Sequence, residues 1–252
     1  MRFIILFAIT LFYQCGNAQS YNFKFQAHQP PSHAVWTELL SKNVDEKGKV
    51  NYRGFIGDST KLNSYLETLS KNPPHETKWT KEDQIAYWIN AYNAFTVQLI
   101  IRNYPVESIK DIGGKIPFIN SSWDIKFIAI GGEVFDLNNL EHGILRKYFN
   151  EPRIHFAVNC ASISCPKLRN EAYEGKKLNA QLSDQTKSFL ADTSKNKFLS
   201  AEKAELSKLF KWFTGDFTKN ESLISFINRY APKKLNKDAD IDYLEYNWSL
   251  NE

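Results

Sequence analysis

The chain has 252 residues, of which 42% are hydrophobic and 14% aromatic, and its formal net charge is +4. This composition is ample for a packed core and excludes an intrinsically disordered chain. Lysine and glutamate alternate along the sequence instead of forming a long basic run, so we expect no nucleic-acid partner.

Residues 1–18 have the pattern of a secretory signal peptide. Arg2 supplies a positive charge, an apolar run covers residues 3–13, and small residues lead to Ala18. We therefore predict cleavage near Ala18, a periplasmic or secreted location, and a single domain over residues 19–252. Lipid attachment at Cys15 is less favoured, because bulky residues precede it. The apolar run is shorter than the about 20 residues of a transmembrane helix, and we expect no membrane span elsewhere.

Apolar periodicity predicts three helices in the first half of the chain. The first ends near Asn43, the second has apolar positions from Leu62 to Leu69, and the third runs from a Thr80 cap to Tyr104. The third is apolar nearly all round, which is typical of a central buried helix. Its Asn90 and Asn93 need partners inside the protein. They tie a loop to the core, which we favour, or one of them orients a catalytic group or binds substrate.

The second half combines strands with shorter helices. Gly131 and Gly132 between apolar runs predict a hairpin, a helix is expected from about Leu137 to Phe149, and Arg153 to Val158 has the alternation of a strand. Further elements are expected over residues 178–190, 221–230 and 241–246, the last being a strand. The whole predicts an α+β fold that is mostly helical, with a small, mainly antiparallel sheet in the second half.

Cys160 and Cys165 lie in a loop of small residues after the predicted strand. Such a loop would bring backbone N–H groups, near Ala161 and Ser162, to an oxyanion formed beside a thiol. Four interpretations compete, in falling order: a disulfide, thiol chemistry, a purely structural loop and metal binding. The C-x4-C spacing is not a usual zinc pattern, so we expect no metal and no cofactor.

The predicted helix over residues 137–149 carries the groups that would activate a thiol. Glu141 falls on its apolar face, where a carboxylate needs a partner, so it forms a structural salt bridge or takes part in catalysis. His142 projects away from Glu141 and is the predicted base for Cys160. Strand alternation would put His155 on the face opposite Cys160.

The remaining candidates are substrate contacts. Arg146 or Arg153 would hold an anionic group, such as a peptide carboxylate or a cell-wall fragment. The candidate substrate-binding set is completed by Asn90, Asn93, His155 and Ser162.

Short motifs along nearly the whole chain resemble the bacterial family known as domain of unknown function 547 (DUF547). They occupy residues 48–52, 86–94, 141–146, 153–166, 210–213 and 246–250. The resemblance implies one family domain of a kind typically found in exported bacterial proteins. It carries over no activity and no catalytic residues.

Two functions are consistent with these features. The first is an exported Cys–His hydrolase or amidase, with Cys160 as nucleophile, acting on a small-molecule or peptide substrate such as a cell-envelope fragment. The alternative is a non-enzymatic periplasmic binding or envelope-assembly domain whose loop is clamped by a disulfide between Cys160 and Cys165.

Overall fold

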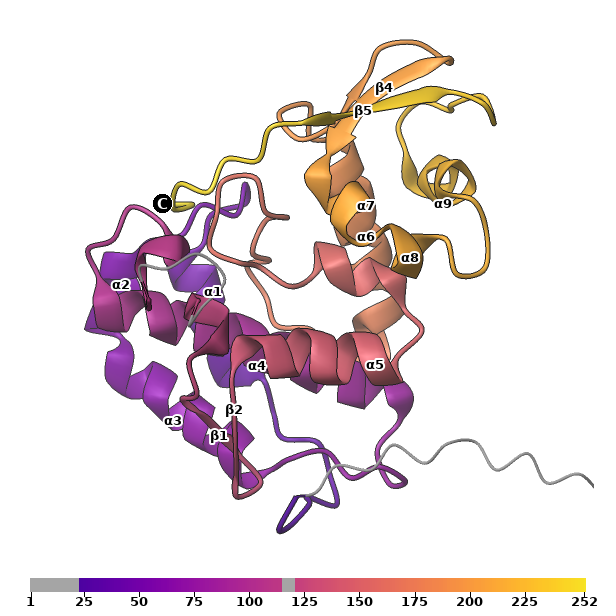
Figure 1. Cartoon of the computed structure of the whole chain (residues 1–252). Helices are drawn as coiled ribbons and strands as arrows, with labels where there is room; N and C mark the ends of the chain where they lie inside the picture. The colour runs from indigo at the N-terminus through magenta and orange to yellow at the C-terminus, as the bar shows by residue number, and fades with distance from the viewer. Residues whose placement is uncertain (1–22, 115–120) are drawn as a thin grey trace, which may run out of the picture.

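The computed structural model describes residues 23–114 and 121–252; the predicted signal peptide lies outside them. Four helices form the first half: α1 (Ala34–Asn43), α2 (Tyr52–Gly57), α3 (Ser59–Lys71) and α4 (Lys81–Asn103). Helix α4 crosses the middle of the molecule, with α1, α2 and α3 beside it and the last third of the chain, from α6 (Leu178–Ala191) to β5 (Asp240–Leu244), above it (Figure 1).

Helix α4 is the centre of the larger hydrophobic core. The Thr80 side chain caps it by accepting a hydrogen bond from the Asp83 N–H, as its sequence predicts. Every residue from Gln84 to Ile100 is buried, because α2 and α3 pack against one part of the helix and the later elements η3 (Asn139–Leu145), η5 (Gly175–Lys177) and α6 pack against the rest. Polar side chains on this helix are therefore enclosed and must be paired within the protein.

The predicted hairpin is present as β1 (Ile128–Ile130) and β2 (Glu133–Phe135), an antiparallel pair. Gly131 and Gly132 join the strands with φ angles of 61° and 83°, a backbone region that glycine enters without steric cost. The second sheet is formed by β3 (Lys197–Phe198), β4 (Lys203–Ser207) and β5 (Asp240–Leu244). Strands β3 and β4 are antiparallel whereas β4 and β5 are parallel, so this sheet is mixed. The α+β class is confirmed.

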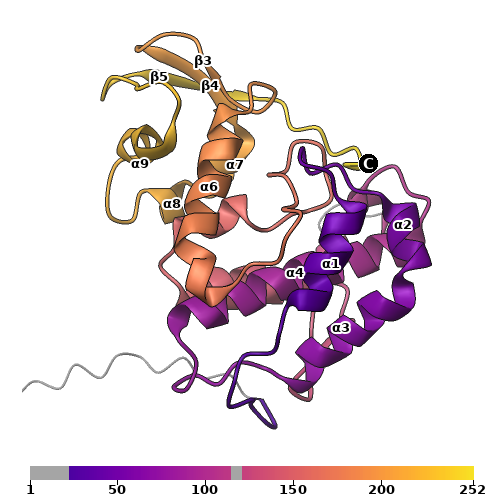
Figure 2. The same cartoon turned by 180° about the vertical axis from the view of Figure 1, so that it is seen from behind.

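A second, smaller core lies beneath the three-stranded sheet. Its helices are α6 (Leu178–Ala191), α7 (Lys208–Trp212), α8 (Thr214–Phe217) and α9 (Leu223–Tyr230). Figure 2 shows α6 extending from this sheet toward α4, so it links the two halves. The ring of Phe156 packs among Phe189, Phe210 and Phe226 of this core.

Two predicted elements have a different conformation. Residues 153–158 are not a strand: Pro152–Phe156 forms a 3-10 helix, η4, which Pro152 opens and the Glu151 side chain caps at the Arg153 N–H. The predicted helix over 137–149 is mainly a π-helix, η3 (Asn139–Leu145), followed by the short α5 (Arg146–Tyr148). Arguments from strand alternation and from an α-helical wheel therefore do not hold at these positions.

Further 3-10 turns are η1 (Ile109–Asp111), η2 (Ser122–Asp124) and η5 (Gly175–Lys177). None of the helices within the described ranges has both the length and the apolar character that a bilayer crossing demands.

The C-terminal segment returns from β5 to the first half of the molecule (Figure 1). On the way, the Ile163 N–H donates to the Ser249 carbonyl at 2.9 Å and the Asn251 N–H donates to the Ala161 carbonyl at 3.1 Å. The Val50 N–H in turn donates to the Asn251 carbonyl at 2.8 Å. This segment therefore holds the cysteine loop against the helices of the first half.

Candidate active site

Asn93 on α4 fixes the start of the cysteine loop. Its Nδ2 donates to the Ala157 carbonyl at 2.9 Å, and its Oδ1 accepts from the Asn159 N–H at 2.8 Å. Asn90 pairs with the backbone of Tyr173 in the same two-way manner. These bonds use both ends of each amide, so the loop-tying interpretation is supported, and the predicted substrate contacts of Asn90 and Asn93 are replaced by structural ones.

Asn159 closes the base of the loop. Its Nδ2 donates to the Pro166 carbonyl at 2.7 Å, and its Oδ1 accepts from the Ala161 N–H at 2.9 Å. Ala161 has φ of 60°, a left-handed conformation that is strained for a residue with a Cβ. The Ala161 N–H is thereby engaged, so the predicted oxyanion role does not fit it. The Ser162 backbone is one of the smaller influences that lower the pKa of Cys160.

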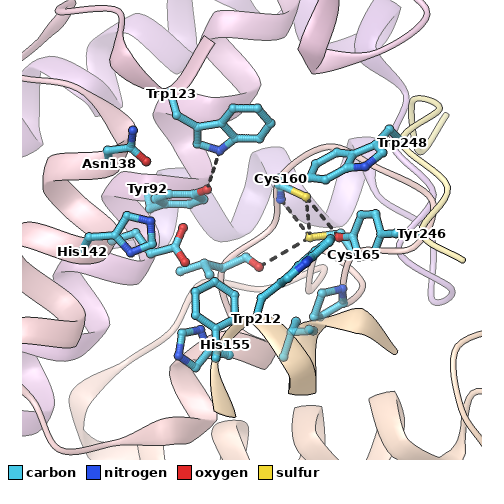
Figure 3. A pocket seen from close by; sticks show the side chains of 15 residues that line it. Tyr92, Trp123, Asn138, His142, His155, Cys160, Cys165, Trp212, Tyr246 and Trp248 are labelled. Carbon is cyan, nitrogen blue, oxygen red and sulfur yellow. Dashed lines mark hydrogen bonds between the residues drawn. The ribbon is translucent and has the colours of Figure 1, made fainter. Parts of the chain in front are cut away.

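The Cys160 sulfur sits among several hydrogen-bonding groups. It lies 3.0 Å from the Cys165 sulfur and 3.4 Å from Tyr246 Oη, both labelled in Figure 3. It also lies 3.2 Å from Ser162 Oγ. Both cysteines are free thiols, so the loop keeps this shape without the disulfide clamp that the alternative function requires. Ser162, predicted to bind substrate, is buried, and its hydroxyl group contacts the Cys160 sulfur instead.

The two thiols differ in acidity. Hydrogen bonds from Cys165, and then from Ser162 and Tyr246, lower the pKa of Cys160 to about 7 against the opposing effect of burial. Burial raises the pKa of Cys165 well above its ordinary value, and the negative charge at Cys160 raises it further. Near neutral pH, a large fraction of Cys160 is therefore thiolate, whereas Cys165 retains its proton.

Cys160 lines a pocket of about 220 Å³ at the junction of the two halves. The polar residues that line it are Asn138, Glu141, His142, His155, Cys160 and Cys165. Figure 3 shows His142, Tyr92 and Asn138 on one side of the pocket and Cys160, Tyr246 and Trp248 on the other. The structure thus brings the predicted catalytic residues Cys160, Glu141 and His142 to one cavity.

Aromatic side chains form much of the rest of the pocket wall. They are Tyr92, Trp123, Trp212, Phe213, Tyr246 and Trp248. The rings of Trp212 and Tyr246 lie 4.8 Å apart, and Trp212 is 47% exposed. Sequence reasoning did not assign these residues to the site. The signal was the aromatic content of the motifs at 210–213 and 246–250, which come from distant parts of the chain.

Glu141 is a buried carboxyl group, 8% exposed, that the π-helix directs to the pocket. Burial, and then the negative charge of Cys160, raise its pKa to about 7, although Arg146 and a hydrogen bond with Tyr92 act in the opposite sense. The predicted structural salt bridge would require a direct cation partner, but the neighbouring Arg146 bonds to Asp216. A carboxyl group that titrates near neutral pH inside a pocket has the properties of a general acid or base.

His142 does not hydrogen-bond to Cys160. Within the described ranges, the Cys160 sulfur bonds with Cys165, Ser162 and Tyr246, while His142 Nδ1 lies 2.9 Å from Arg146 Nη1. Arginine only donates, so Nδ1 accepts and the neutral ring carries its proton on Nε2. Burial and then Arg146 lower the pKa of His142. In this state His142 is a hydrogen-bond donor rather than the predicted base.

Asp216, which sequence reasoning missed, does not line the pocket but binds His155, which does. Its carboxylate bonds Arg146 Nε at 2.6 Å and His155 Nε2 at 2.7 Å. Although partial burial opposes it, the bonds from His155 and Arg146 hold the pKa of Asp216 well below its ordinary value. The ring of Phe213 stacks on His155 with centroids 3.9 Å apart.

The two arginines predicted to bind an anionic substrate are already paired. Arg146 holds Asp216 through two nitrogens. Arg153 lies outside the pocket and pairs with Glu151 at 2.6 Å. In the described part of the chain, no group of three or more His, Cys, Asp and Glu residues is arranged to hold a metal ion.

The fold and the pocket define a mainly helical α+β protein with a thiol site. Residues 76–190 match the family model described as "Protein of unknown function, DUF547", which confirms the resemblance over this part of the chain. The match covers α4, Glu141, His142 and both loop cysteines, and leaves out the aromatic wall from Trp212 to Trp248. No curated protein and no solved structure matches the chain.

Proposed function

We propose that the protein is a thiol hydrolase or amidase that acts through Cys160 on a peptide or a cell-envelope fragment. The observation that carries this proposal is the Cys160 sulfur, which lines a pocket and receives hydrogen bonds from Ser162 and Tyr246 that favour its thiolate form. A thiolate next to a cavity is the nucleophile that acyl transfer requires.

Glu141 is the proposed acid and base of the reaction. The Cys160 thiolate attacks the carbonyl carbon, and the C–N bond breaks as the amine takes the proton of Glu141. The Glu141 carboxylate then deprotonates the water that hydrolyses the thioester, which returns the thiolate and the protonated acid. Since the pKa values of Glu141 and Cys160 are both about 7, the combination of a thiolate with a protonated carboxyl is accessible at neutral pH.

His142 has a separate role in this proposal. Its Nε2–H donates to the carbonyl oxygen of the substrate, where negative charge develops, because Nδ1 is held by Arg146. This replaces the role of the Ala161 N–H, which already donates to Asn159.

The pocket wall indicates the kind of substrate. A volume of about 220 Å³ is below the roughly 300–1,000 Å³ of drug-sized ligand sites, so the pocket suits one residue or sugar of a longer molecule. Trp212, Trp248 and Tyr246 offer flat apolar faces to peptide planes or sugar rings. Because Arg146 and Arg153 are paired, recognition by stacking is favoured over recognition of an anionic group.

We also propose that the protein is exported, on the basis of the charge, apolar run and small residues within positions 1–18. A substrate in the cell envelope is compatible with that location. The alternative of a non-enzymatic binding domain was built on a loop clamped by a disulfide, whereas both loop cysteines are free thiols in this structure.

An activated ester tests the proposed nucleophile without knowledge of the natural substrate. Reduced protein is mixed with p-nitrophenyl acetate, and the acylated residue is located by mass spectrometry. We expect a burst of nitrophenol, one acetyl group on Cys160 and slow turnover, and we expect the adduct in the Cys165→Ser protein but not in folded Cys160→Ser. Acylation elsewhere, or none on folded wild-type protein, would rule out Cys160 as nucleophile. Release of new amino groups from envelope peptides then identifies the substrate.

A further inference from the structure

Cys165 is a buried thiol that forms no bond to the substrate in the proposed hydrolysis. It is 5% exposed, and its sulfur contacts the Cys160 sulfur at 3.0 Å and the Val158 carbonyl at 3.8 Å. We propose that Cys160 and Cys165 form a reversible dithiol–disulfide couple, so that the loop also carries out thiol–disulfide exchange. The chemistry of the couple is independent of hydrolysis, whereas its effect on hydrolysis rests on the function proposed above.

The loop is already closed at both ends. Asn159, which precedes Cys160, donates to the carbonyl of Pro166, which follows Cys165. The Cys160 N–H also donates to the Cys165 sulfur at 2.9 Å. Because the native fold has already ordered this ring of residues, forming the S–S bond costs little further chain entropy. A disulfide bond is about 2.0 Å long, so the sulfurs need to approach each other by only about 1 Å.

The environments of the two sulfurs suit them to different steps of thiol–disulfide exchange. Cys160 opens on the pocket and carries the thiolate, so it is the sulfur that reaches an external disulfide. Cys165 is more buried and keeps its proton until it reacts, so it suits the second, resolving step. The aromatic wall formed by Trp212 and Trp248 limits access to Cys160 to small or extended molecules.

The exchange balances with a low-molecular-weight disulfide, RSSR, as oxidant. The Cys160 thiolate attacks one sulfur of RSSR, which forms a mixed disulfide and releases one RS⁻. Cys165 gives its proton to this RS⁻ and attacks the Cys160 sulfur, which closes the protein disulfide and releases the second RS⁻. The protein loses two electrons and RSSR gains them. A dithiol reverses both steps.

Oxidation would remove the nucleophile of the proposed hydrolase. In the disulfide the Cys160 sulfur carries no charge, so it no longer attracts the hydrogen bonds that Ser162 and Tyr246 give to a thiolate. The pocket would therefore be inactive while oxidised and active again after reduction.

The test equilibrates the reduced full chain with glutathione buffers of increasing oxidised fraction, followed by acid quenching, alkylation and mass spectrometry. We expect wild-type protein to lose two hydrogens and retain no glutathione. The Cys165→Ser protein should stop with one glutathione on Cys160, and Cys160→Ser should take up none. Circular dichroism checks that each variant is folded.

The proposed dithiol–disulfide couple would be overturned if wild-type protein accumulated glutathione on Cys160, as the Cys165→Ser protein is expected to do. The couple would also be overturned if the folded protein stayed reduced in fully oxidised glutathione while the urea-unfolded protein was oxidised under the same conditions. Ester acylation of the same samples separates the two proposals. If the protein forms the disulfide but its reduced form is not acylated by the ester, the result supports the dithiol–disulfide couple and rejects the hydrolase. If the reduced protein is acylated but never forms the disulfide, the result supports the hydrolase and rejects the couple.

Discussion

The Nε2 atom of His155 lies 2.7 Å from Oδ2 of Asp216, a residue 61 positions later in the chain. The same carboxylate binds Arg146, so Asp216 joins η4, α8 and the residues that follow the π-helix. His155 Nδ1 is buried and has no hydrogen-bond partner among the described residues. Asp216 therefore fixes which ring nitrogen of His155 carries the proton.

Replacement of Asp216 by Asn should destabilise the fold at neutral pH. It leaves Arg146 and His155 without their anionic partner, and we expect a loss of about 2 kcal/mol in the free energy of unfolding. This is less than for a fully buried pair, because the Asp216 side chain is 30% exposed. Urea denaturation at several pH values measures the difference in unfolding free energy between wild type and Asp216→Asn.

The pH dependence of this loss has a definite sign. The pKa of Asp216 is depressed in the folded state, so its stabilisation is present above its ordinary value of 3.8 and disappears as the pH falls below that value. The difference between wild type and Asp216→Asn should shrink in that acidic range. Asp238→Asn, at an exposed position, is the control and should show no such difference. An equal loss at all pH values would contradict the assignment.

Tyr246→Phe should make Cys160 less acidic. The hydroxyl group lies 3.4 Å from the sulfur, and a hydrogen bond to a charged group is worth about 1.5–3 kcal/mol. The pKa of Cys160 should therefore rise from about 7 by roughly one unit. The pH dependence of alkylation by iodoacetamide, done on Cys165→Ser and on Cys165→Ser with Tyr246→Phe, reports Cys160 alone.

Tyr243→Phe is the matched control, because Tyr243 lies on β5 and is not among the pocket residues. Removal of Cys165 itself takes away the largest stabilising hydrogen bond, so the reference protein starts from a pKa above that of wild type. Identical alkylation profiles with and without the Tyr246 hydroxyl would show that this contact does not stabilise the thiolate.

Glu141→Gln should change how stability depends on pH. Burial raises the pKa of Glu141 from 4.5 to about 7, so the folded state keeps a proton that the unfolded state loses between these values. The wild-type free energy of unfolding should therefore fall as the pH rises through this window, by about 3 kcal/mol, and the glutamine variant should lack this fall. Chemical denaturation from pH 4.5 to above 7 tests it.

Glu46→Gln, at an exposed position, provides the comparison and should follow wild type throughout. In the ester assay, Glu141→Gln should still form the acetyl adduct on Cys160 but release it more slowly, because the proposed base for water is gone. Deacylation at the wild-type rate would exclude that role for Glu141.

Asn93→Ala should loosen the cysteine loop. It removes two buried hydrogen bonds and leaves the Ala157 carbonyl and the Asn159 N–H unpaired, so we expect a loss of about 2–4 kcal/mol in unfolding free energy. Asn103→Ala, near the exposed end of the same helix, should cost much less. Faster amide hydrogen exchange at Asn159 and its neighbours would confirm the local effect, and exchange at the wild-type rate would count against it.

The sequence already indicates much of the architecture, because local rules act over a few residues. The Thr80 cap, the apolar surface of α4 and the paired Gly131 and Gly132 predict their elements near the observed bounds. The same rules fail at residues 153–158 and 139–145. There a proline and a capping Glu151 start a 3-10 helix, and a π-helix replaces the regular one.

The sequence by itself determined the resemblance to the DUF547 family, the α+β class, the two loop thiols, and the presence of a carboxyl group, Glu141, within an apolar segment. These depend on residue type and short spacing. Only the tertiary structure decided which groups meet: Tyr246 at the Cys160 sulfur, Asp216 at His155, and the tryptophans of distant segments in one wall. The physical reason is that pairing across 61 or 86 positions depends on how α4, the cysteine loop and the C-terminal segment pack together.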